Sequence, residues 1–177
     1  MKNILKIIGG ISLLLLIVLI VKTVSNKPIV QNDAISLAPL PEHAIQHISE
    51  AIQMATETPN DFYQYDSATF FAYRKFIERT YPLVHQKLTR TIIDRFHYIY
   101  EWKGTDTSKL PIVLMAHYDV VPVEASAVKL WHAKPYGGEV KEKYIWGRGV
   151  LDDKSSMISI LEATEAQLKA GFEPKQS

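Results

Sequence analysis

The spacing of apolar side chains changes along this sequence, and each spacing predicts a different element. Residues 7–21 contain no charged side chain. From residue 41 onward, apolar side chains recur every three or four positions, which is typical of a half-buried helix. A second helix should run from about Ser67 to Leu88, and Pro82 should kink or split it. The positions in register are Ala44, Ile45, Ile48, Ile52 and Ala55 in the first of these helices, and Phe70, Phe71, Arg74, Ile77 and Tyr81 in the second.

The pattern after residue 90 favours strands. Residues 92–102 alternate and place Phe96, Tyr98, Tyr100 and Trp102 on one face. Residues 112–116, IVLMA, are apolar throughout, which predicts a strand covered on both faces, as in a parallel or mixed sheet.

Beyond that strand, residues 137–149 read as a short hairpin. A last helix should carry apolar side chains from 157 to 168 and stop at Gly171. The predicted fold class is α/β, with a mixed or parallel sheet flanked by helices.

The N-terminal apolar stretch bears on location. Its fifteen uncharged residues rise about 22 Å, which is short of a hydrocarbon core of roughly 30 Å. Counting from Ile4 to Val24, with Lys6 and Lys22 reaching toward the headgroups, closes most of the gap. A membrane anchor over residues 1–24 is therefore favoured, and a cleaved secretory signal or a core helix is the alternative.

Lysines flank both ends of this stretch, so its orientation stays open. As an anchor or as a signal, it predicts that the rest of the protein lies outside the cytoplasm, membrane-anchored or secreted. Residues 25–40 are rich in proline and read as a linker.

Composition narrows the chemistry. The chain has 20 basic and 19 acidic residues and a net charge of +1, which argues against a nucleic-acid partner. It has no cysteine, so any metal ion must bind histidine, aspartate or glutamate.

Two polar clusters could carry that chemistry. His117 and Asp119 follow the predicted buried strand, and a carboxylate beside an imidazole fixes the tautomer of a metal-binding histidine. The alternative is a histidine that is satisfied by its neighbours at a strand end. Asp152 and Asp153 precede the last helix, and one of them is expected to cap it.

A third pair, His43 and His47, has a spacing of four that can chelate a metal ion. No glutamate follows His43, so the zinc-protease helix motif fails and a solvated helix face is favoured.

Three blocks in order, PIVLMAHYDVVPV, WHAKPYGG and YIWGRGVLDDKSSM, resemble the co-catalytic zinc aminoacylase and carboxypeptidase family. That family includes succinyl-diaminopimelate desuccinylase and acetylornithine deacetylase. The sequence is most similar to the branch of carboxypeptidase S and the secreted N-acyl-amino-acid hydrolases. The resemblance covers roughly residues 41–175, so residues 41–177 are expected to be the N-terminal part of the catalytic domain.

The resemblance implies roles for particular residues. His117 is similar to the ligand of one zinc ion, Asp119 to the residue that orients this histidine, and Asp152 to the carboxylate that bridges two zinc ions. Asp153 and Lys154 match the motif without a role that can be transferred. The family's adjacent glutamate pair, which supplies the general base and a further ligand, is absent from this sequence.

These implications predict the N-terminal part of a zinc-dependent hydrolase that cleaves peptide C-termini or N-acyl amino acids. With about half of the metal site, the chain is expected to have little activity alone, unless a second polypeptide supplies the rest. The alternative is a membrane-tethered, noncatalytic module that binds a peptide on the same surface.

Overall fold

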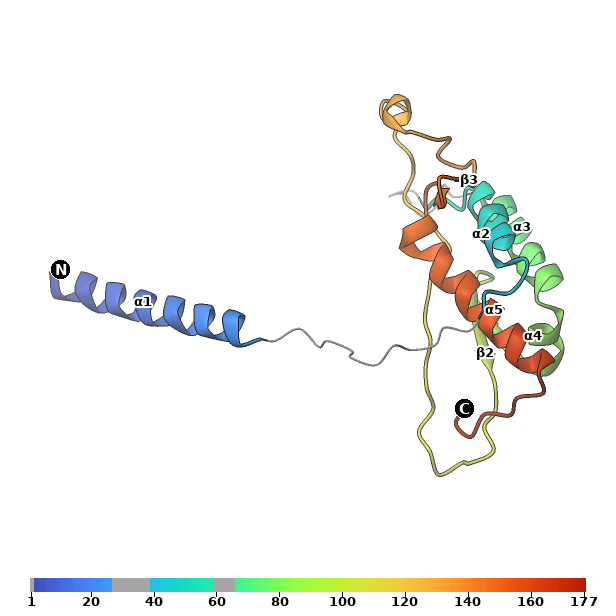
Figure 1. Ribbon diagram of the computed structural model, residues 1–177, viewed down its shortest axis with the longest axis horizontal. Coiled ribbons are helices and arrows are strands. Elements are labelled where there is room, and N and C mark those ends of the chain that lie inside the picture. Colours follow the sequence, from blue (N-terminus) through green and yellow to red (C-terminus); the bar gives the residue numbers. More distant parts are fainter. Residues whose placement is uncertain (1, 27–38, 59–65) are drawn as a thin grey trace. The chain divides into compact units, whose positions relative to one another are not determined.

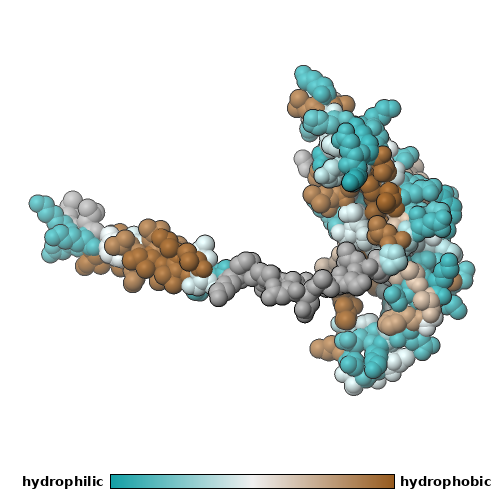
Figure 2. All heavy atoms as spheres, viewed as in Figure 1, coloured by the Kyte–Doolittle hydropathy of each residue, from teal (hydrophilic) through white to brown (hydrophobic). Residues whose placement is uncertain are grey.

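The N-terminal apolar stretch forms one helix, α1 (Lys2–Ser25). The structure is a computed structural model that describes residues 2–26, 39–58 and 66–177, and it divides into two units, Met1–Pro39 and Leu40–Ser177. By length and composition α1 could cross a membrane, and its apolar side chains are exposed along its length (Figure 2). The predicted helix is confirmed, whereas its place in a membrane stays a prediction. Most of the predicted linker, residues 27–38, lies outside the described part.

The second unit contains the helices α2 (Ala44–Gln53), α3 (Ser67–Thr80), α4 (Pro82–Lys87) and α5 (Ser155–Lys169) (Figure 1). The predicted break at Pro82 is confirmed, because this residue begins α4 and Tyr81 separates it from α3. Asp66 starts α3 by accepting bonds from the Ala68 amide (3.0 Å) and the Thr69 hydroxyl (2.6 Å). Helix α5 packs against both α2 and α4.

An aromatic core joins these helices to the rest of the unit. Tyr73 and Phe76 of α3 are buried, and Tyr118 reaches the same cluster from a distant segment. The Tyr118 ring stacks on the Tyr73 ring with centroids 4.7 Å apart and an interplanar angle of 19°. Stacking at this separation fixes the segment that carries Tyr118 against α3.

Two antiparallel hairpins supply the strands of the described chain. β1 (Thr89–Ile93) pairs with β2 (His97–Glu101), and β3 (Glu139–Lys141) pairs with β4 (Tyr144–Trp146). A short 3₁₀ helix, Val128–Leu130, lies between them in sequence.

The β3–β4 hairpin was predicted, whereas the β1–β2 hairpin replaces a single expected strand over residues 92–102. Its turn residues, Asp94 and Arg95, have φ of 46° and 66°. Positive φ at such positions usually goes with glycine or asparagine, and this turn lacks both. The predicted alternation is nevertheless present, since Phe96, Tyr98 and Tyr100 pack against the core.

The prediction of a buried strand over residues 112–116 is wrong for this chain. The segment belongs to no sheet, and Val113 and Met115 are 73% and 84% exposed. The Ile112 amide donates a hydrogen bond to the Ser177 carbonyl at 2.8 Å. None of the described residues forms a strand beside it, and a lone extended segment has no ladder to bury it. The mixed α/β class holds, with two small sheets in place of one covered sheet.

Two glycines with positive φ allow a matched test of this packing. A Cβ added at Gly138 (φ +60°) would lie 2.3 Å from the Ser49 carbonyl oxygen, whereas one at Gly171 (φ +73°) would meet nothing within 4 Å. Gly171→Ala should lower the free energy of unfolding by about 1 kcal/mol through backbone strain. Gly138→Ala should cost roughly 1–3 kcal/mol more because backbone must move. Urea denaturation of both variants measures the difference, and equal losses would contradict the close approach.

Candidate metal centre

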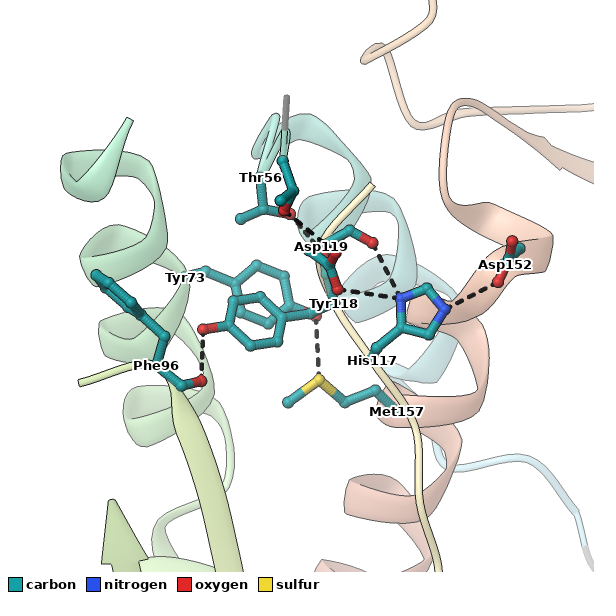
Figure 3. A network of polar contacts seen from close by, with 9 residues as sticks. Thr56, Tyr73, Phe96, His117, Tyr118, Asp119, Asp152 and Met157 are labelled. Carbon is teal, nitrogen blue, oxygen red and sulfur yellow. Dashed lines mark hydrogen bonds and ion pairs between the residues drawn. The ribbon is translucent and has the colours of Figure 1, made fainter. Parts of the chain in front are cut away.

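The structure brings together two residues that lie 35 positions apart in sequence. His117 Nε2 is 2.9 Å from Asp152 Oδ1 (Figure 3). The other ring nitrogen, Nδ1, lies 3.1 Å from the Asp119 carbonyl oxygen and 3.3 Å from Asp119 Oδ1. The imidazole is therefore held at both nitrogens, with Asp119 on one side and Asp152 on the other.

The His117 segment is positioned by residues 56–58, which run parallel to it after α2. The Val120 amide donates to the Thr56 carbonyl and the Thr58 amide donates to the Val120 carbonyl, each at 2.9 Å. The buried Thr56 hydroxyl donates to the Tyr118 carbonyl at 2.5 Å. The Thr58 hydroxyl donates to Asp119 Oδ2 at 3.1 Å, which leaves Oδ1 directed at His117.

Tyr118 anchors the same segment from the opposite direction. Its side chain points into the core while its neighbours His117 and Asp119 stay accessible (Figure 3). The Tyr118 hydroxyl donates to the Phe96 carbonyl at 2.8 Å, so this aromatic residue also holds the end of the β1–β2 hairpin. Burial raises the pKa of Tyr118, so its hydroxyl stays protonated and remains a donor.

Asp152 is positioned by a tight turn before α5. Gly149 has φ +83°, and a Cβ there would lie 2.5 Å from Val120 Cγ1, so the turn packs directly against the segment that follows His117. The Lys154 amide donates to the Gly149 carbonyl at 3.0 Å and closes the turn. Asp152 and Asp153 have non-helical backbone angles within this turn.

The expectation that one of the two aspartates caps α5 is wrong. The N-cap position belongs to Lys154, and no side chain there accepts a bond from the first helical amides. Because both aspartates precede the cap in a non-helical conformation, their carboxylates are free to serve the site instead. Ser155 begins the helix.

Lys154 lies beside the site, and the sequence assigned no role to it. Its side chain is fully buried, and Nζ donates to the carbonyls of Ala51 (2.9 Å) and Met54 (2.6 Å). Burial lowers the pKa of Lys154 to about 7, and the negative charge of Asp119 opposes this shift. The only sequence signal for this residue is its place in the motif with Asp152 and Asp153.

The charges around His117 favour its protonated form. Partial burial acts to lower the pKa of this imidazole, but the bond to the Asp119 carbonyl and the Asp152 carboxylate outweigh it, and the pKa lies above its usual value. Because a metal ion binds the neutral imidazole, a proton at Nε2 would compete with it.

The donor set fits one edge of a zinc site. An imidazole nitrogen and a carboxylate oxygen are ordinary zinc ligands, and the side chains of His117 and Asp152 are 50% and 86% exposed, so both can reach an ion. Zinc usually takes four ligands, and over residues 2–26, 39–58 and 66–177 no group of three histidine, aspartate or glutamate side chains is placed to hold a metal ion. The half-site expected from the sequence stays a prediction.

His43 and His47 form no such edge. His43 is exposed at the start of α2, whereas His47 pairs with Glu162 of α5, whose carboxylate also accepts a bond from the Tyr81 hydroxyl at 2.9 Å. The expectation of a solvated helix face is therefore wrong for His47, which joins α2 to α5.

A cavity of about 530 Å³ opens beside His117. Its walls are mainly apolar and aromatic, and its polar lining residues are Thr58, Asp94, His97, His117 and Asp119. Mixed lining of this kind suits an apolar group whose polar end meets the site. The residues that dominate the apolar wall are Phe70, Phe96, Tyr98, Tyr118, Met157 and Leu161.

Comparison with known proteins shows what this chain is similar to. Residues 113–177 match the model of peptidase family M20/M25/M40. The chain is 41% identical over 118 residues to probable carboxypeptidase S-like 2 of Dictyostelium discoideum, covering 67% of this chain and 22% of that protein. It is 32% identical over 145 residues to carboxypeptidase S of Saccharomyces cerevisiae, covering 76% of this chain and 24% of that protein.

A third relative has another name. The chain is 32% identical over 143 residues to N-fatty-acyl-amino acid synthase/hydrolase PM20D1 of Xenopus tropicalis, covering 78% of this chain and 27% of that protein. The predicted resemblance to this hydrolase family is thus confirmed, and the chain is related to it through the portion that carries His117 and Asp152. The chain spans about a quarter of the length of these relatives.

The Thr56 hydroxyl offers a test of how the His117 segment is held. Thr56→Val keeps the shape of the side chain but leaves the Tyr118 carbonyl without that donor, so the free energy of unfolding should fall by about 1–3 kcal/mol. Thr164→Val is the matched control, because the Thr164 hydroxyl bonds the Ile160 carbonyl within α5, where the helix already supplies an amide donor. Its loss should stay within about 0.5 kcal/mol. Equal small losses in urea denaturation would show that the Thr56 bond contributes little.

Proposed function

We propose that this chain is the N-terminal part of a zinc-dependent amidohydrolase or carboxypeptidase that acts on peptide C-termini or N-acyl amino acids. The observation that carries the proposal is the contact between His117 Nε2 and Asp152 Oδ1, in a chain related to M20 peptidases. In this proposal His117 and Asp152 would hold zinc, and Asp119 would orient His117.

The residues of this chain prepare the site. The Asp119 carbonyl and carboxylate hold His117 Nδ1, so the second ring nitrogen points toward Asp152. Thr58 holds the far oxygen of Asp119 and keeps the carboxylate from rotating away. Bound zinc would polarise the amide carbonyl and lower the pKa of a water molecule. The general base is not among the described residues of this site, so we propose that this chain alone has little activity.

The substrate assignment rests on the relatives and on the cavity. Carboxypeptidase S and the N-fatty-acyl-amino acid hydrolase are names for enzymes that act at an amide beside an amino acid. The apolar cavity next to His117 suits the apolar part of such a substrate, an amino-acid side chain or an acyl chain.

The exposed segment 112–116 supports a role for further polypeptide. Its apolar side chains and free backbone would pair with a neighbouring strand, and the Ser177 carbonyl already bonds the Ile112 amide at its start. We propose that a second polypeptide, or residues outside this sequence, completes a mixed or parallel sheet flanked by helices and supplies the remaining ligands.

Helix α1 supports a location at or beyond a membrane. Its 24 residues rise about 36 Å, enough to cross a hydrocarbon core of roughly 30 Å. We propose that it anchors the protein with its catalytic part outside the cytoplasm, or serves as a secretory signal.

A second candidate function is a membrane-tethered module that binds peptides without cleaving them. The observation in its favour is that no group of three histidine, aspartate or glutamate side chains among the described residues is placed to hold a metal ion. In that case the same polar edge and the same cavity bind ligand without catalysis.

Zinc binding by the full chain in detergent micelles tests the proposed ligands. His117→Ala and Asp152→Ala should each weaken zinc binding at least about tenfold, because each removes a donor. His43→Ala is the control and should leave the affinity unchanged, since His43 lies outside the site. Competition with a chromophoric chelator gives the affinity and the stoichiometry. Two tightly bound zinc ions per chain would contradict the half-site, and an unchanged affinity in His117→Ala would contradict its role.

A chimera separates the two functions. Residues 41–177 would replace the matched segment of Saccharomyces cerevisiae carboxypeptidase S, so that the relative supplies the rest of the site. The chimera should hydrolyse peptide C-termini, His117→Ala should abolish this activity, and His43→Ala should preserve it. A folded chimera that binds peptide but never cleaves it would favour the noncatalytic module.

A further inference from the structure

Lys154 lies between the two parts of the candidate site, the His117 segment and the Asp152 turn. It follows Asp152 by two positions, yet its side chain turns inward and is fully buried. A buried ammonium is costly unless its donors are satisfied, and Nζ meets this requirement with two carbonyls and the face of the Tyr73 ring, 5.2 Å away.

The bonds to the two carbonyls connect Lys154 to the His117 segment through the backbone. Ala51 is in the last turn of α2 and Met54 follows its end, so the ammonium caps carbonyls that the helix itself leaves without partners. Two residues beyond Met54, the Thr56 carbonyl and hydroxyl bond Val120 and Tyr118. Lys154 therefore fixes the start of residues 56–58, the segment that pairs with the His117 segment.

The contact with the Tyr73 ring connects Lys154 to the His117 segment through side chains. The Tyr73 ring under the ammonium is the ring on which Tyr118 stacks. Tyr118 is the residue between His117 and Asp119. Both routes from Lys154 thus end at Tyr118, one through its carbonyl and one through its ring.

We propose that Lys154 is a positioning residue that sets the distance between His117 and Asp152. This inference rests on the proposed metal site and assigns a role to the lysine that neither the motif nor the mechanism above uses. Because the same residue closes the Asp152 turn with its backbone amide and supports the His117 segment with its ammonium, it links the two proposed ligands through one residue.

The test compares Lys154→Met with a variant that weakens the core elsewhere. Methionine keeps an apolar stem and removes the donors, whereas Val84→Ala removes buried volume from α4, away from the site. The imidazole nitrogens of His117 are observed by ¹H–¹⁵N correlation in the metal-free full chain in detergent micelles. His117→Ala identifies its signals, and His132 serves as an internal reference.

Lys154→Met should shift the His117 ring signals toward those of a solvent-exposed imidazole, while Val84→Ala leaves them in place even though its Tm falls. Zinc affinity should drop at least about tenfold in Lys154→Met and stay at the wild-type value in Val84→Ala. Unshifted His117 signals in Lys154→Met would overturn the proposal, as would equal losses of affinity in the two variants.

Two further outcomes are informative. If Lys154→Met fails to fold, Lys154→Gln is read in the same way, since its shorter side chain does not reach both carbonyls. If neither Lys154→Met nor Lys154→Gln folds, the role of Lys154 is purely structural and the proposal is overturned. If the wild-type chain takes up no zinc, the proposed function fails, and the metal-free imidazole signals still decide whether Lys154 positions His117.

Discussion

The burial of Tyr118 between two accessible polar residues governs the arrangement of the site. In an extended segment neighbouring side chains alternate, so driving Tyr118 into the aromatic core turns both His117 and Asp119 outward on the same side. The hydrophobic gain of one large aromatic side chain, about 1.5–3 kcal/mol for full burial, helps to fix the direction of the imidazole. The stack on Tyr73 and the bond to the Phe96 carbonyl then determine its depth.

The Asp152 turn is fitted to that segment by close contact. Gly149 leaves no room for a side chain against Val120, and Lys154 extends inward from the same turn toward the end of α2. The support of the site consists of α2, residues 56–58 after it, the His117 segment and the start of α5. It is held by backbone bonds and buried aromatic rings, and its exposed edge carries the imidazole and the carboxylate.

The elements that sequence predicted well are those stabilised by nearby residues. The 3.6-residue period identified α2 and α5, and the missing amide of Pro82 predicted the end of α3. The β1–β2 hairpin was missed because its turn residues, Asp94 and Arg95, lie inside an alternating run that reads as one strand. The strand over residues 112–116 was predicted wrongly because an apolar run shows that a segment can be buried but does not supply the partner that buries it.

In the candidate site, too, the residues marked by a local pattern were predicted and the one with distant partners was not. His117, Asp119 and Asp152 were found from their places after a strand and before a helix, and from the family resemblance, and the structure brings all three together. Lys154 was not assigned, because its partners are backbone carbonyls about 100 positions away that no pattern in the sequence marks. Buried charges bonded to backbone are therefore the part of such a site that only coordinates reveal.

The central claim is that His117 and Asp152 bind one cation between them. X-ray absorption at the zinc edge of the loaded full chain tests it most directly. The account predicts nitrogen and oxygen ligands at about 2.0–2.2 Å with outer-shell scattering from a single imidazole. Scattering from two or more imidazoles would place the ion at other histidines, and would contradict the account.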